Sequence, residues 1–467
     1  MTVLKVKGPV GSGLLALGLP MLLATLLMAA GMLVVGASPA DAATFSVNKT
    51  GDAGDRKLND SKCDTSRNNG KQCTLRAAIE EANDTSGVDT IEFNIGSTNS
   101  VKTISPASDL PTITDTLTID GYTQRGASPN TLEEGNDAAL KVELNGSNAG
   151  ADGEGLVISA SDSTIKGLVI NDFTDEGVLI AGFDATGNKV EGNFIGTNPT
   201  GTTSEGNVTG VFVLADSNTV GGAQPEMRNV ISGNAQNGVF IFGSSSDANR
   251  VEGNFIGTTA DGSGDLGNDD HGVLIQGTNN TVGGVDDPGT PQTEFPANTI
   301  AHNGEDGVSV FSFVDTGNAF LSNSIFSNGD LGIDLGSDGV TANDTDDPDT
   351  GANNLQNFPV IGSAIRSNTT GITTISGTLN SNPSLDFVVQ CFLTDGAPAS
   401  DHGEGSVLLD TIVVTTDANG DGAFFCHSSL PTLGQVPEQT VSATATNILT
   451  TGATSEFSLN VGVSAGL

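Results

Sequence analysis

The sequence has no tryptophan and a single tyrosine, Tyr122, among its 467 residues. Sugar-binding sites commonly use Trp or Tyr, whose rings combine a large apolar face with a polar group. Their scarcity disfavours a lectin or a glycosidase that depends on such platforms. Histidine is also scarce, and the four present (His271, His302, His402 and His427) are dispersed along the chain. Zinc sites cluster His or Cys, so this spacing argues against a metal-loaded carrier.

Basic residues are few. The chain has 17 Lys and Arg against 56 Asp and Glu, a formal net charge of −39. Such a surface repels nucleic acid and anionic lipid and attracts cations, and it also suits a salty medium. We therefore expect no nucleic-acid partner.

Long apolar runs are absent except for Leu14–Val35. Lys5 and Lys7 precede this run and Ala40-Asp41-Ala42 follows it, a pattern typical of a secretory signal with a cleavage site. The run is long enough for an uncleaved anchor, but Gly18, Pro20 and the cleavage motif favour removal. We predict a signal peptide over residues 1–42, no later membrane span, and a secreted or cell-surface protein.

Four cysteines occur as two near pairs. In an exported chain this spacing favours local disulfides. We expect Cys63 to bond to Cys73 and Cys391 to Cys426.

The middle of the chain repeats itself. Asn188-Lys-Val-Glu-Gly-Asn-Phe-Ile-Gly-Thr returns almost unchanged at Asn249, and Asn218-Thr-Val-Gly-Gly returns at Asn280. Units of about 30 residues bury little alone but form a continuous core when stacked. Units lengthen at Ala223–Arg228 and Val285–Ala297, and loops that grow at one corner commonly line the side that binds something.

Alignment of the units gives three columns of apolar residues, each in a short β-branched segment that alternates apolar with polar positions. The first column is Ile165, Val190, Val220, Val251, Val282 and Phe320; the second is Ile170, Ile195, Ile231, Ile256, Ile300 and Ile325; the third pairs Val178/Ile180, Val211/Val213, Val239/Ile241, Val273/Ile275, Val308/Val310 and Ile333/Leu335. This pattern predicts an all-β fold, a right-handed parallel β-helix with three sheets over residues 161–336. A fourth column, Asn193, Asn229, Asn254, Asn298 and Asn323, predicts stacked amides that hydrogen-bond along the stack rather than a catalytic set.

Residues 43–160 lead into the repeats. They contain short strand patterns and one amphipathic helix, predicted over Thr74–Asn83, which we expect to cap the open end of the stack. Cys73-Thr-Leu-Arg-Ala-Ala-Ile-Glu-Glu-Ala-Asn resembles the Cys-Ser-Leu-Arg-Glu-Ala element of exported bacterial β-helix proteins named CSLREA after it. Thr74 and Ala77 depart from the serine and glutamate of that element. With the repeats, the resemblance covers roughly residues 44–360 and implies fold and export, not an activity. The implied fold is shared with pectate lyases and polygalacturonases, and a fold does not carry a function.

Beyond the repeats the pattern changes. Residues 337–358 form a polar, acidic bridge, and residues 359–467 alternate like antiparallel strands separated by turn residues. We predict a C-terminal immunoglobulin-like β-sandwich with strands over Ile372–Leu379, Leu385–Leu393, Val407–Thr415, Ala423–His427, Gln439–Thr446 and Glu456–Val461.

Acidic residues precede the third-column strand in successive units, at Asp175-Glu176, Asp269-Asp270-His271, Glu305-Asp306 and Asp330. Stacking places equivalent positions about 4.8 Å apart and predicts an acidic stripe. The catalytic candidates are Asp269, Asp270, His271, Glu305 and Asp306. The Asp-Asp pair with His271 resembles polygalacturonase sites, where paired carboxylates do acid–base work. The Gly-His-Gly and Arg-x-Lys elements of those sites are missing, which favours a solvated turn.

The acidic bridge holds Asp344, Asp346, Asp347 and Asp349, and hard cations take such oxygens. We predict a calcium site there, with a solvated linker as the alternative.

No complete catalytic set is evident, so the sequence favours a non-catalytic exported protein for adhesion or matrix contact, with an extracellular polysaccharide or a surface receptor as partner. The alternative is a polysaccharide-active enzyme, a uronate lyase or a glycoside hydrolase, that uses the acidic corner.

Overall fold

The computed structural model describes residues 42–466 apart from 59, 67–71, 244–245, 285–296, 312–314, 395–399, 429–438 and 448–451. Apart from Ala42 and Ala297, the predicted signal peptide and the insertion Val285–Ala297 lie outside these residues. Within the described part of the chain, no helix is long and apolar enough to cross a membrane. Residues Ala40–Leu467 form one compact unit.

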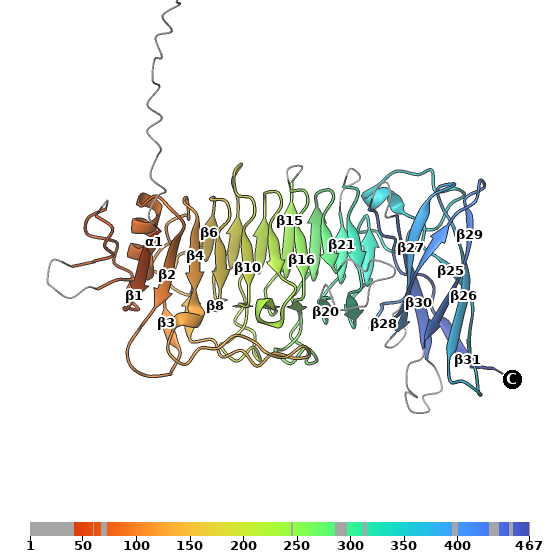
Figure 1. Cartoon of the computed structure of the whole chain (residues 1–467), viewed down its shortest axis with the longest axis horizontal. Helices are drawn as coiled ribbons and strands as arrows, with labels where there is room; N and C mark the ends of the chain where they lie inside the picture. Colours follow the sequence, from red (N-terminus) through yellow and green to blue (C-terminus); the bar gives the residue numbers. More distant parts are fainter. Residues whose placement is uncertain are drawn as a thin grey trace, which may run out of the picture. The chain divides into compact units, whose positions relative to one another are not determined.

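Three parallel sheets build the stack of coils (Figure 1). Sheet A contains β1 (Thr44–Val47), β2 (Asp89–Phe93), β4 (Leu117–Asp120), β7 (Thr164–Lys166), β10 (Lys189–Glu191), β13 (Thr219–Gly221), β16 (Arg250–Glu252), β19 (Thr281–Gly283) and β22 (Ala319–Leu321). Sheet B contains β3 (Lys102–Ile104), β5 (Val142–Asn145), β8 (Leu168–Asn171), β11 (Phe194–Ile195), β14 (Val230–Ile231), β17 (Phe255–Ile256), β20 (Thr299–Ala301) and β23 (Ser324–Phe326). Sheet C contains β6 (Leu156–Ile158), β9 (Val178–Ile180), β12 (Val211–Val213), β15 (Val239–Phe242), β18 (Val273–Gln276), β21 (Val308–Val310) and β24 (Ile333–Leu335).

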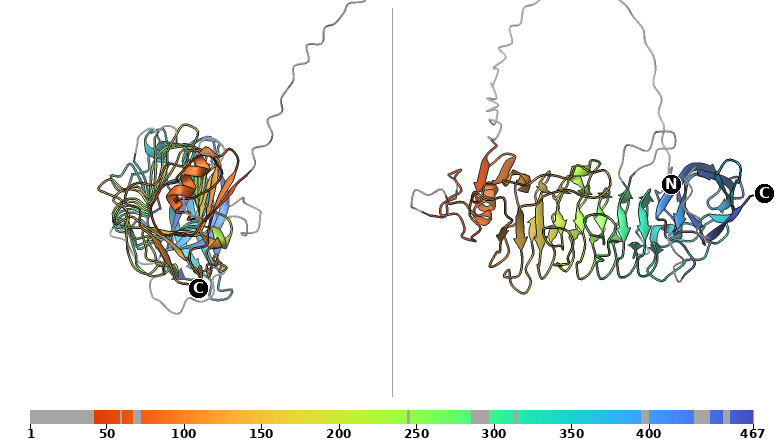
Figure 2. Two further views of the ribbon diagram at one scale, coloured as in Figure 1. Left: turned by 90° about the vertical axis from the view of Figure 1, so that its left-hand side faces the viewer. Right: turned by 90° about the horizontal axis from the view of Figure 1, so that it is seen from below.

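The three predicted apolar columns are confirmed as the core of a parallel β-helix. Val190 pairs with Ile165 and Val220 in sheet A, and Ile195 pairs with Ile170 and Ile231 in sheet B. In sheet C, Val211 and Val213 pair with Val239 and Ile241. Every residue of the three columns is buried in one continuous core, and the coils superimpose when the stack is viewed from the β1 end (Figure 2). The right-handed sense stays a prediction.

Asparagine ladders run along the turns between the strands. In the predicted ladder each side-chain amide donates to the side-chain oxygen of the next coil, from Asn193 through to Asn323 at 2.9–3.2 Å. Two more ladders were not predicted. One is Asn188, Asn218, Asn249, Asn280, Asn318 and Asn353; the other is Asn207, Asn234, Asn268, Asn303 and Asn328. A buried amide without partners costs about 1–3 kcal/mol, and the ladders pair groups that the turns would otherwise leave without partners. The exception is Asn188, the first residue of its ladder, which donates through its backbone N–H and whose side-chain nitrogen has no partner.

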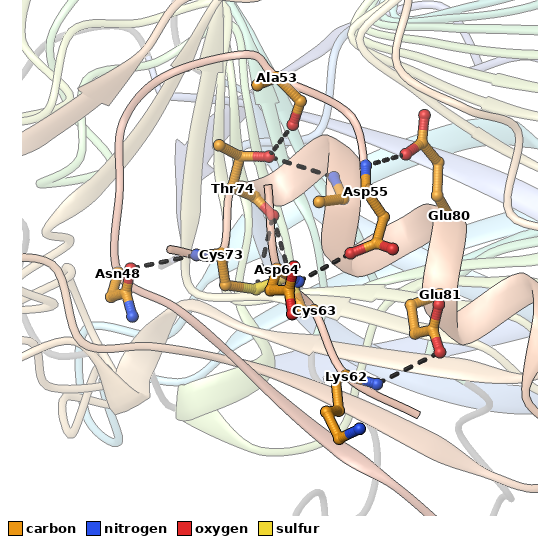
Figure 3. The surroundings of a disulfide bond; sticks show 11 residues. Asn48, Ala53, Asp55, Lys62, Cys63, Asp64, Cys73, Thr74, Glu80 and Glu81 are labelled. Carbon is orange, nitrogen blue, oxygen red and sulfur yellow. Dashed lines mark hydrogen bonds between the residues drawn. A yellow bond between two sulfur atoms is a disulfide. The ribbon is translucent and has the colours of Figure 1, made fainter. Parts of the chain in front are cut away.

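The predicted helix is α1 (Leu75–Asp84), which packs on β1 and β2 at the end of sheet A (Figure 1). Thr74 is its N-cap and accepts a hydrogen bond from the Ala77 N–H at 3.2 Å, which satisfies a donor that the first turn leaves free. Figure 3 shows the predicted Cys63–Cys73 disulfide beside this cap. The disulfide ties Cys63 to the residue that precedes the cap. Next to Cys63, the Lys62 N–H donates to Glu81 at 3.2 Å.

The segment 124–140 crosses the outer face of sheet B. The outward side chains Val169, Phe194, Val230 and Phe255 are buried beneath Tyr122, Ala138 and Leu140. The outer face of sheet B is therefore apolar in its middle coils, from Val169 to Phe255, and the chain itself covers this part.

The C-terminal strands form one seven-stranded mixed sheet, the terminal sheet, in the order β28-β27-β30-β31-β25-β26-β29. Its strands are β25 (Val360–Arg366), β26 (Thr373–Asn380), β27 (Asp386–Thr394), β28 (Val407–Thr415), β29 (Asp421–Ser428), β30 (Thr440–Asn447) and β31 (Val461–Ala465). β31 pairs antiparallel with β30 and parallel with β25, so it joins two antiparallel triplets. The predicted Cys391–Cys426 disulfide links β27 to β29 across the core between them. The immunoglobulin-like arrangement of two separate sheets is not confirmed.

Two strands differ from the prediction. β25 was not predicted, and the last strand begins at Val461 instead of running over Glu456–Val461. Residues 455–458 are buried instead against the last coil, where the Glu456 side chain accepts hydrogen bonds from the N–H groups of Leu335 and Thr341.

Candidate functional site

Acidic residues of consecutive coils occupy one corner of the stack, just before the strands of sheet C. The Glu305 N–H donates to the Asp270 carbonyl at 3.0 Å, and the Asp330 N–H donates to the Glu305 carbonyl at 3.1 Å. Asp270, Glu305 and Asp330 therefore hold equivalent positions one coil apart, as the predicted acidic stripe requires.

His271 lies between two carboxylates of the following coil. Its Nε2 is 3.0 Å from Glu305 Oε2, and its Nδ1 is 3.3 Å from Asp306 Oδ2. The Asp306 N–H also approaches Nδ1 at 3.3 Å, so protonated Nδ1 donates to the carboxylate, whereas unprotonated Nδ1 accepts from the amide. The His271 and Asp306 side chains are only 12% and 5% exposed, whereas Glu305 is 49% exposed.

The charge around His271 decides its protonation. Burial by itself lowers the pKa of His271, but the hydrogen bond to Asp306 and the charges of Asp306, Glu305 and Asp270 outweigh burial and raise it. The imidazole is thus held toward its cationic form by the stripe.

These residues line a cleft of about 640 Å³ between the acidic corner and the segment that follows β24. Its lining comprises His271, Glu305, Asp306, Asn328, Gly329, Asp330, Leu331, Asp334, Ser337, Gly339, Val340 and Ser400. Of the five catalytic candidates, His271, Glu305 and Asp306 line the cleft. Asp269 and Asp270 do not, although the charge of Asp270 contributes to the raised pKa of His271. The insertions Ala223–Arg228 and Val285–Ala297 lie between strands of sheet A and strands of sheet B. The cleft instead lies at the corner before sheet C, so it is not on the side where the insertions led us to expect a binding site.

Asp334 is a cleft residue that the sequence analysis missed. It occupies the middle of β24, is 5% exposed and accepts the Gly339 N–H through Oδ2 at 3.1 Å, while its Oδ1 is buried without a hydrogen-bond partner. Burial, followed by the charge of Asp306, raises the pKa of Asp334 to about 6. The sequence contained a signal for Asp334. The third residue of Gly332-Ile-Asp-Leu is a carboxylate, whereas the same position in the earlier units is an apolar residue or serine.

A second acidic group lies nearer the N-terminus on the same corner. Carboxylate oxygens of Glu154, Asp175 and Glu176 all lie within 4.8 Å of one another. Burial, followed by the charge of Asp175, raises the pKa of Glu176 to about 7. These side chains repel one another unless one of them holds a proton or a cation lies between them.

The predicted calcium cluster is gathered only in part. Carboxylate oxygens of Asp344, Asp347 and Asp349 lie within 4.8 Å of one another, but Asp346 is not part of this group. Asp347 is buried and its Oδ2 accepts from Gln356 Nε2 at 2.8 Å and from the Ser381 hydroxyl at 2.5 Å. Burial raises its pKa to about 6. The three carboxylates offer oxygens of the kind that Ca²⁺ takes, and backbone carbonyls or water would have to complete the coordination.

Comparison with known proteins gives little further information. No protein-family model matches the sequence, and no curated protein sequence matches it. Among solved structures, it is similar to full-length tailspike protein 2 from Escherichia coli O157:H7 bacteriophage CAB120, with 11% identity over 86% of this chain and 68% of that chain and a TM-score of 0.26. It is also similar to the enzymatically active domain of tailspike protein 2 from bacteriophage CBA120, with 11% identity over 87% of this chain and 76% of that chain and a TM-score of 0.27. TM-scores this low carry no argument about fold or ligand.

Proposed function

We propose that this chain is an exported, non-catalytic β-helix protein that binds an extracellular glycan in the acidic cleft and so serves adhesion or matrix contact. The observation that carries the proposal is the cleft itself, a concave site of about 640 Å³ with several carboxylates as hydrogen-bond acceptors. Glu305 and Asp330 are accessible to a ligand, and carboxylates are strong acceptors for sugar hydroxyl groups.

A binding role fits the state of His271 better than a catalytic one. Both of its ring nitrogens already face carboxylates, Glu305 and Asp306, so neither is free to exchange a proton with a ligand. A general base must be within hydrogen-bond reach of the proton that it takes. The imidazole serves instead to hold the two carboxylates of the next coil in place.

A glycoside hydrolase is the second candidate, and one observation favours it. Asp334 has a raised pKa, about 6, because it is buried close to the charge of Asp306. A carboxyl group that keeps its proton beside one that has lost it is the arrangement used for acid catalysis of glycoside hydrolysis. A uronate lyase is disfavoured because no Lys or Arg is among the lining residues to act as base.

The proposal also includes export through the N-terminal signal, membership of the CSLREA-type proteins, and a capping role for α1. The packing of Leu75, Ala78 and Ile79 of α1 into the core at the β1 end supports the cap, because an open end would expose apolar side chains.

A binding and turnover screen tests the proposal. The purified protein is applied to an array of extracellular glycans, and bound glycans are then assayed for new reducing ends and for unsaturated uronate. We expect binding without turnover, weakened about tenfold or more in Glu305→Gln or Asp330→Asn and unchanged in Glu92→Gln, a control on β2 far from the cleft. Turnover that disappears in Asp334→Asn would replace the binding role with the hydrolase, and no binding to any glycan would refute both.

A further inference from the structure

The first residue of β2, Asp89, is a carboxylate in apolar surroundings. Its side chain is only 1% exposed. Alternation along β2 puts Asp89 on the same face as Ile91 and Phe93, which belong to the core, and the register pairs it with Leu117 of the next coil. A charge at such a position costs free energy unless a partner compensates it.

Only one of the two carboxylate oxygens of Asp89 has a partner. Oδ1 accepts the Ala43 N–H at 2.7 Å, whereas Oδ2 is buried without a hydrogen-bond partner. The Ala43 carbonyl in turn accepts the Thr90 N–H at 2.9 Å, and the Ala43 side chain packs against the core. The backbone nitrogen of Ala43 is therefore held against a carboxylate that can accept more hydrogen bonds than it receives.

The charges around Asp89 do not supply the missing partner. Burial raises the pKa of Asp89, the Ala43 N–H lowers it, and the charge of Asp115 raises it again. The neighbouring charge is thus of the same sign. Among the ion pairs that the described residues form, none includes Asp89. A cation within hydrogen-bonding distance would stabilise the ionised form of this carboxyl group.

Ala43 is also the residue that follows the predicted export signal. The small-x-small motif Ala40-Asp41-Ala42 places the expected cut at the Ala42–Ala43 bond. Hydrolysis adds water to this bond, with the hydroxyl on the Ala42 carbonyl carbon and the hydrogen on the Ala43 nitrogen. At neutral pH the new carboxyl group releases its proton and the new amine binds one, because an α-amino group has a pKa of about 7.7–8.0. The Ala43 nitrogen then carries a positive charge.

We propose that processing at the Ala42–Ala43 bond creates an α-ammonium group that forms an ion pair with the buried Asp89. The nitrogen already lies 2.7 Å from Oδ1, so the pair requires no rearrangement of the backbone. Three hydrogens replace one, which gives Oδ2 a donor, and Ala42 is exposed, so its removal leaves the third hydrogen to water. The inference rests on the export that the proposed function includes, but it is independent of glycan binding.

The ion pair completes the N-terminal end of the stack. β1 is the outermost strand of sheet A at this end, with β2 as its neighbour (Figure 1). An ion pair at Ala43, the residue before β1, fastens this strand to β2 where the ladder of strands ends. In the unprocessed chain the same nitrogen is an amide with one hydrogen, and Asp89 keeps a buried oxygen without a donor. Processing therefore stabilises the end of the stack on which α1 packs.

The mature N-terminus is tested first. The full chain is expressed with its signal in an exporting bacterial host, and the mass of the intact exported protein is measured. We expect a chain that begins at Ala43. A different first residue, or a chain that keeps residues 1–42, overturns the inference, because Ala43 would then have no free amine.

Melting temperatures then test the pair itself. Two forms are compared at about pH 7, one that begins at Ala43 and a longer one that keeps Asp41-Ala42 and so has an amide at Ala43. We expect the Ala43 form to melt about 2 °C or more above the longer form. Asp89→Asn keeps an oxygen for the Ala43 N–H and should lower the melting temperature of the Ala43 form alone.

The matched control is Glu92→Gln, which removes a carboxylate from the opposite face of the same strand and should change both forms equally. Equal melting of the two unsubstituted forms, or an equal loss in both on Asp89→Asn, overturns the inference.

Labelling gives a second measurement that does not depend on a variant. An ion pair raises the pKa of the α-amine, and one pKa unit lowers its unprotonated, reactive fraction about tenfold. Acylation of the Ala43 amine is followed from about pH 6 to about pH 10, with the exposed Lys49 as the internal reference. We expect the midpoint to lie about one pH unit or more higher in the folded protein than in urea. Equal midpoints overturn the inference, whereas a failure to bind glycans would leave it standing.

Discussion

Glu404, which precedes β28 of the terminal sheet, takes the place of the next asparagine after Asn328. Its Oε1 accepts both the Asn328 N–H at 2.9 Å and the Asn328 side-chain amide at 2.8 Å. One coil earlier, Asn328 accepts the same two groups from Asn303, at 3.2 and 2.9 Å. The ladder therefore ends on a group that only accepts hydrogen bonds when ionised, so no amide hydrogen is left over.

Removal of this acceptor should loosen the last coil. We expect Glu404→Ala to lower the free energy of unfolding by about 1–3 kcal/mol, because two partly buried donors of Asn328 lose their partner. Glu404→Gln keeps an acceptor oxygen and should cost less. Chemical denaturation of both variants measures the difference, and equal losses would show that the ladder does not depend on this oxygen.

Stability should fall as the pH rises from mildly acidic to mildly basic. Burial raises the pKa of Glu456 to about 8 from an ordinary value of 4.5, even though the N–H groups of Leu335 and Thr341 favour its charged form. The folded state then binds a proton that the unfolded state has released, so the contribution of Glu456 to stability is fully present below about pH 4.5 and is lost as the pH rises to about 8.

The raised pKa of Asp334, about 6, acts in the same direction over a narrower range. Melting temperatures at pH 5, 6, 7 and 8 test this dependence. Glu456→Gln should flatten the slope, which for one group is at most about 1.4 kcal/mol per pH unit, whereas the exposed Glu134→Gln should not change it. A melting temperature that rises from pH 5 to pH 8 would contradict the assignment.

Arg228 should be essential for the segment over sheet B. Its guanidinium donates to the carbonyls of Leu132, Glu133 and Gly135 at 3.2, 2.7 and 2.6 Å, and lies 4.5 Å from the centre of the Phe255 ring. A lysine cannot reproduce this planar fork.

We expect Arg228→Lys to cost about 1.5–3 kcal/mol and to expose the segment to a glutamate-specific protease at Glu133 and Glu134. Mass spectrometry of timed digests detects the cut. Arg250→Lys on sheet A serves as the control, and identical digestion of both variants would remove the role given to Arg228.

Calcium should stiffen the segment that follows the repeats if Asp344, Asp347 and Asp349 bind it. A ligand that binds only the folded state adds about 2.7 kcal/mol at a hundred times its dissociation constant. Millimolar CaCl₂ should therefore raise the melting temperature, and Asp344→Asn with Asp349→Asn should abolish the rise, whereas Asp346→Asn should not. An unchanged wild-type melting curve would leave the cluster as a linker.

The sequence predicts the interior of the stack well because the buried residues recur once in each repeat unit. Buried β-branched residues recur at fixed intervals, and the register of the sheets follows from aligning them. β3 escaped prediction because it has one buried residue, Ile104. The segment 124–140 escaped because its contacts join residues about 95 positions apart, such as Glu133 and Arg228, and leave no local pattern.

The candidate site was predictable only in part. Asp270, Glu305 and Asp330 stack because they share a position in the repeat, and the repeat shows this. Asp334 lies on an outward position of its strand, and the buried columns do not fix the residue type at such positions. The signal for Asp334 was the change of residue type at this position, from an apolar residue or serine in the earlier units to a carboxylate.

The asparagine ladders also have a consequence for how such a chain can change in length. In all three ladders the donor lies on the earlier coil and the acceptor on the later one, so every coil presents the same unfilled acceptors to its predecessor and the same unfilled donors to its successor. Gain or loss of whole coils by duplication or deletion therefore leaves both ends compatible with their neighbours. Gain or loss of only part of a coil would interrupt the ladders, because a donor on one coil would no longer meet an acceptor on the next. Glu404 would accept from the last asparagine of the ladder that now ends at Asn328, whatever the number of coils before it.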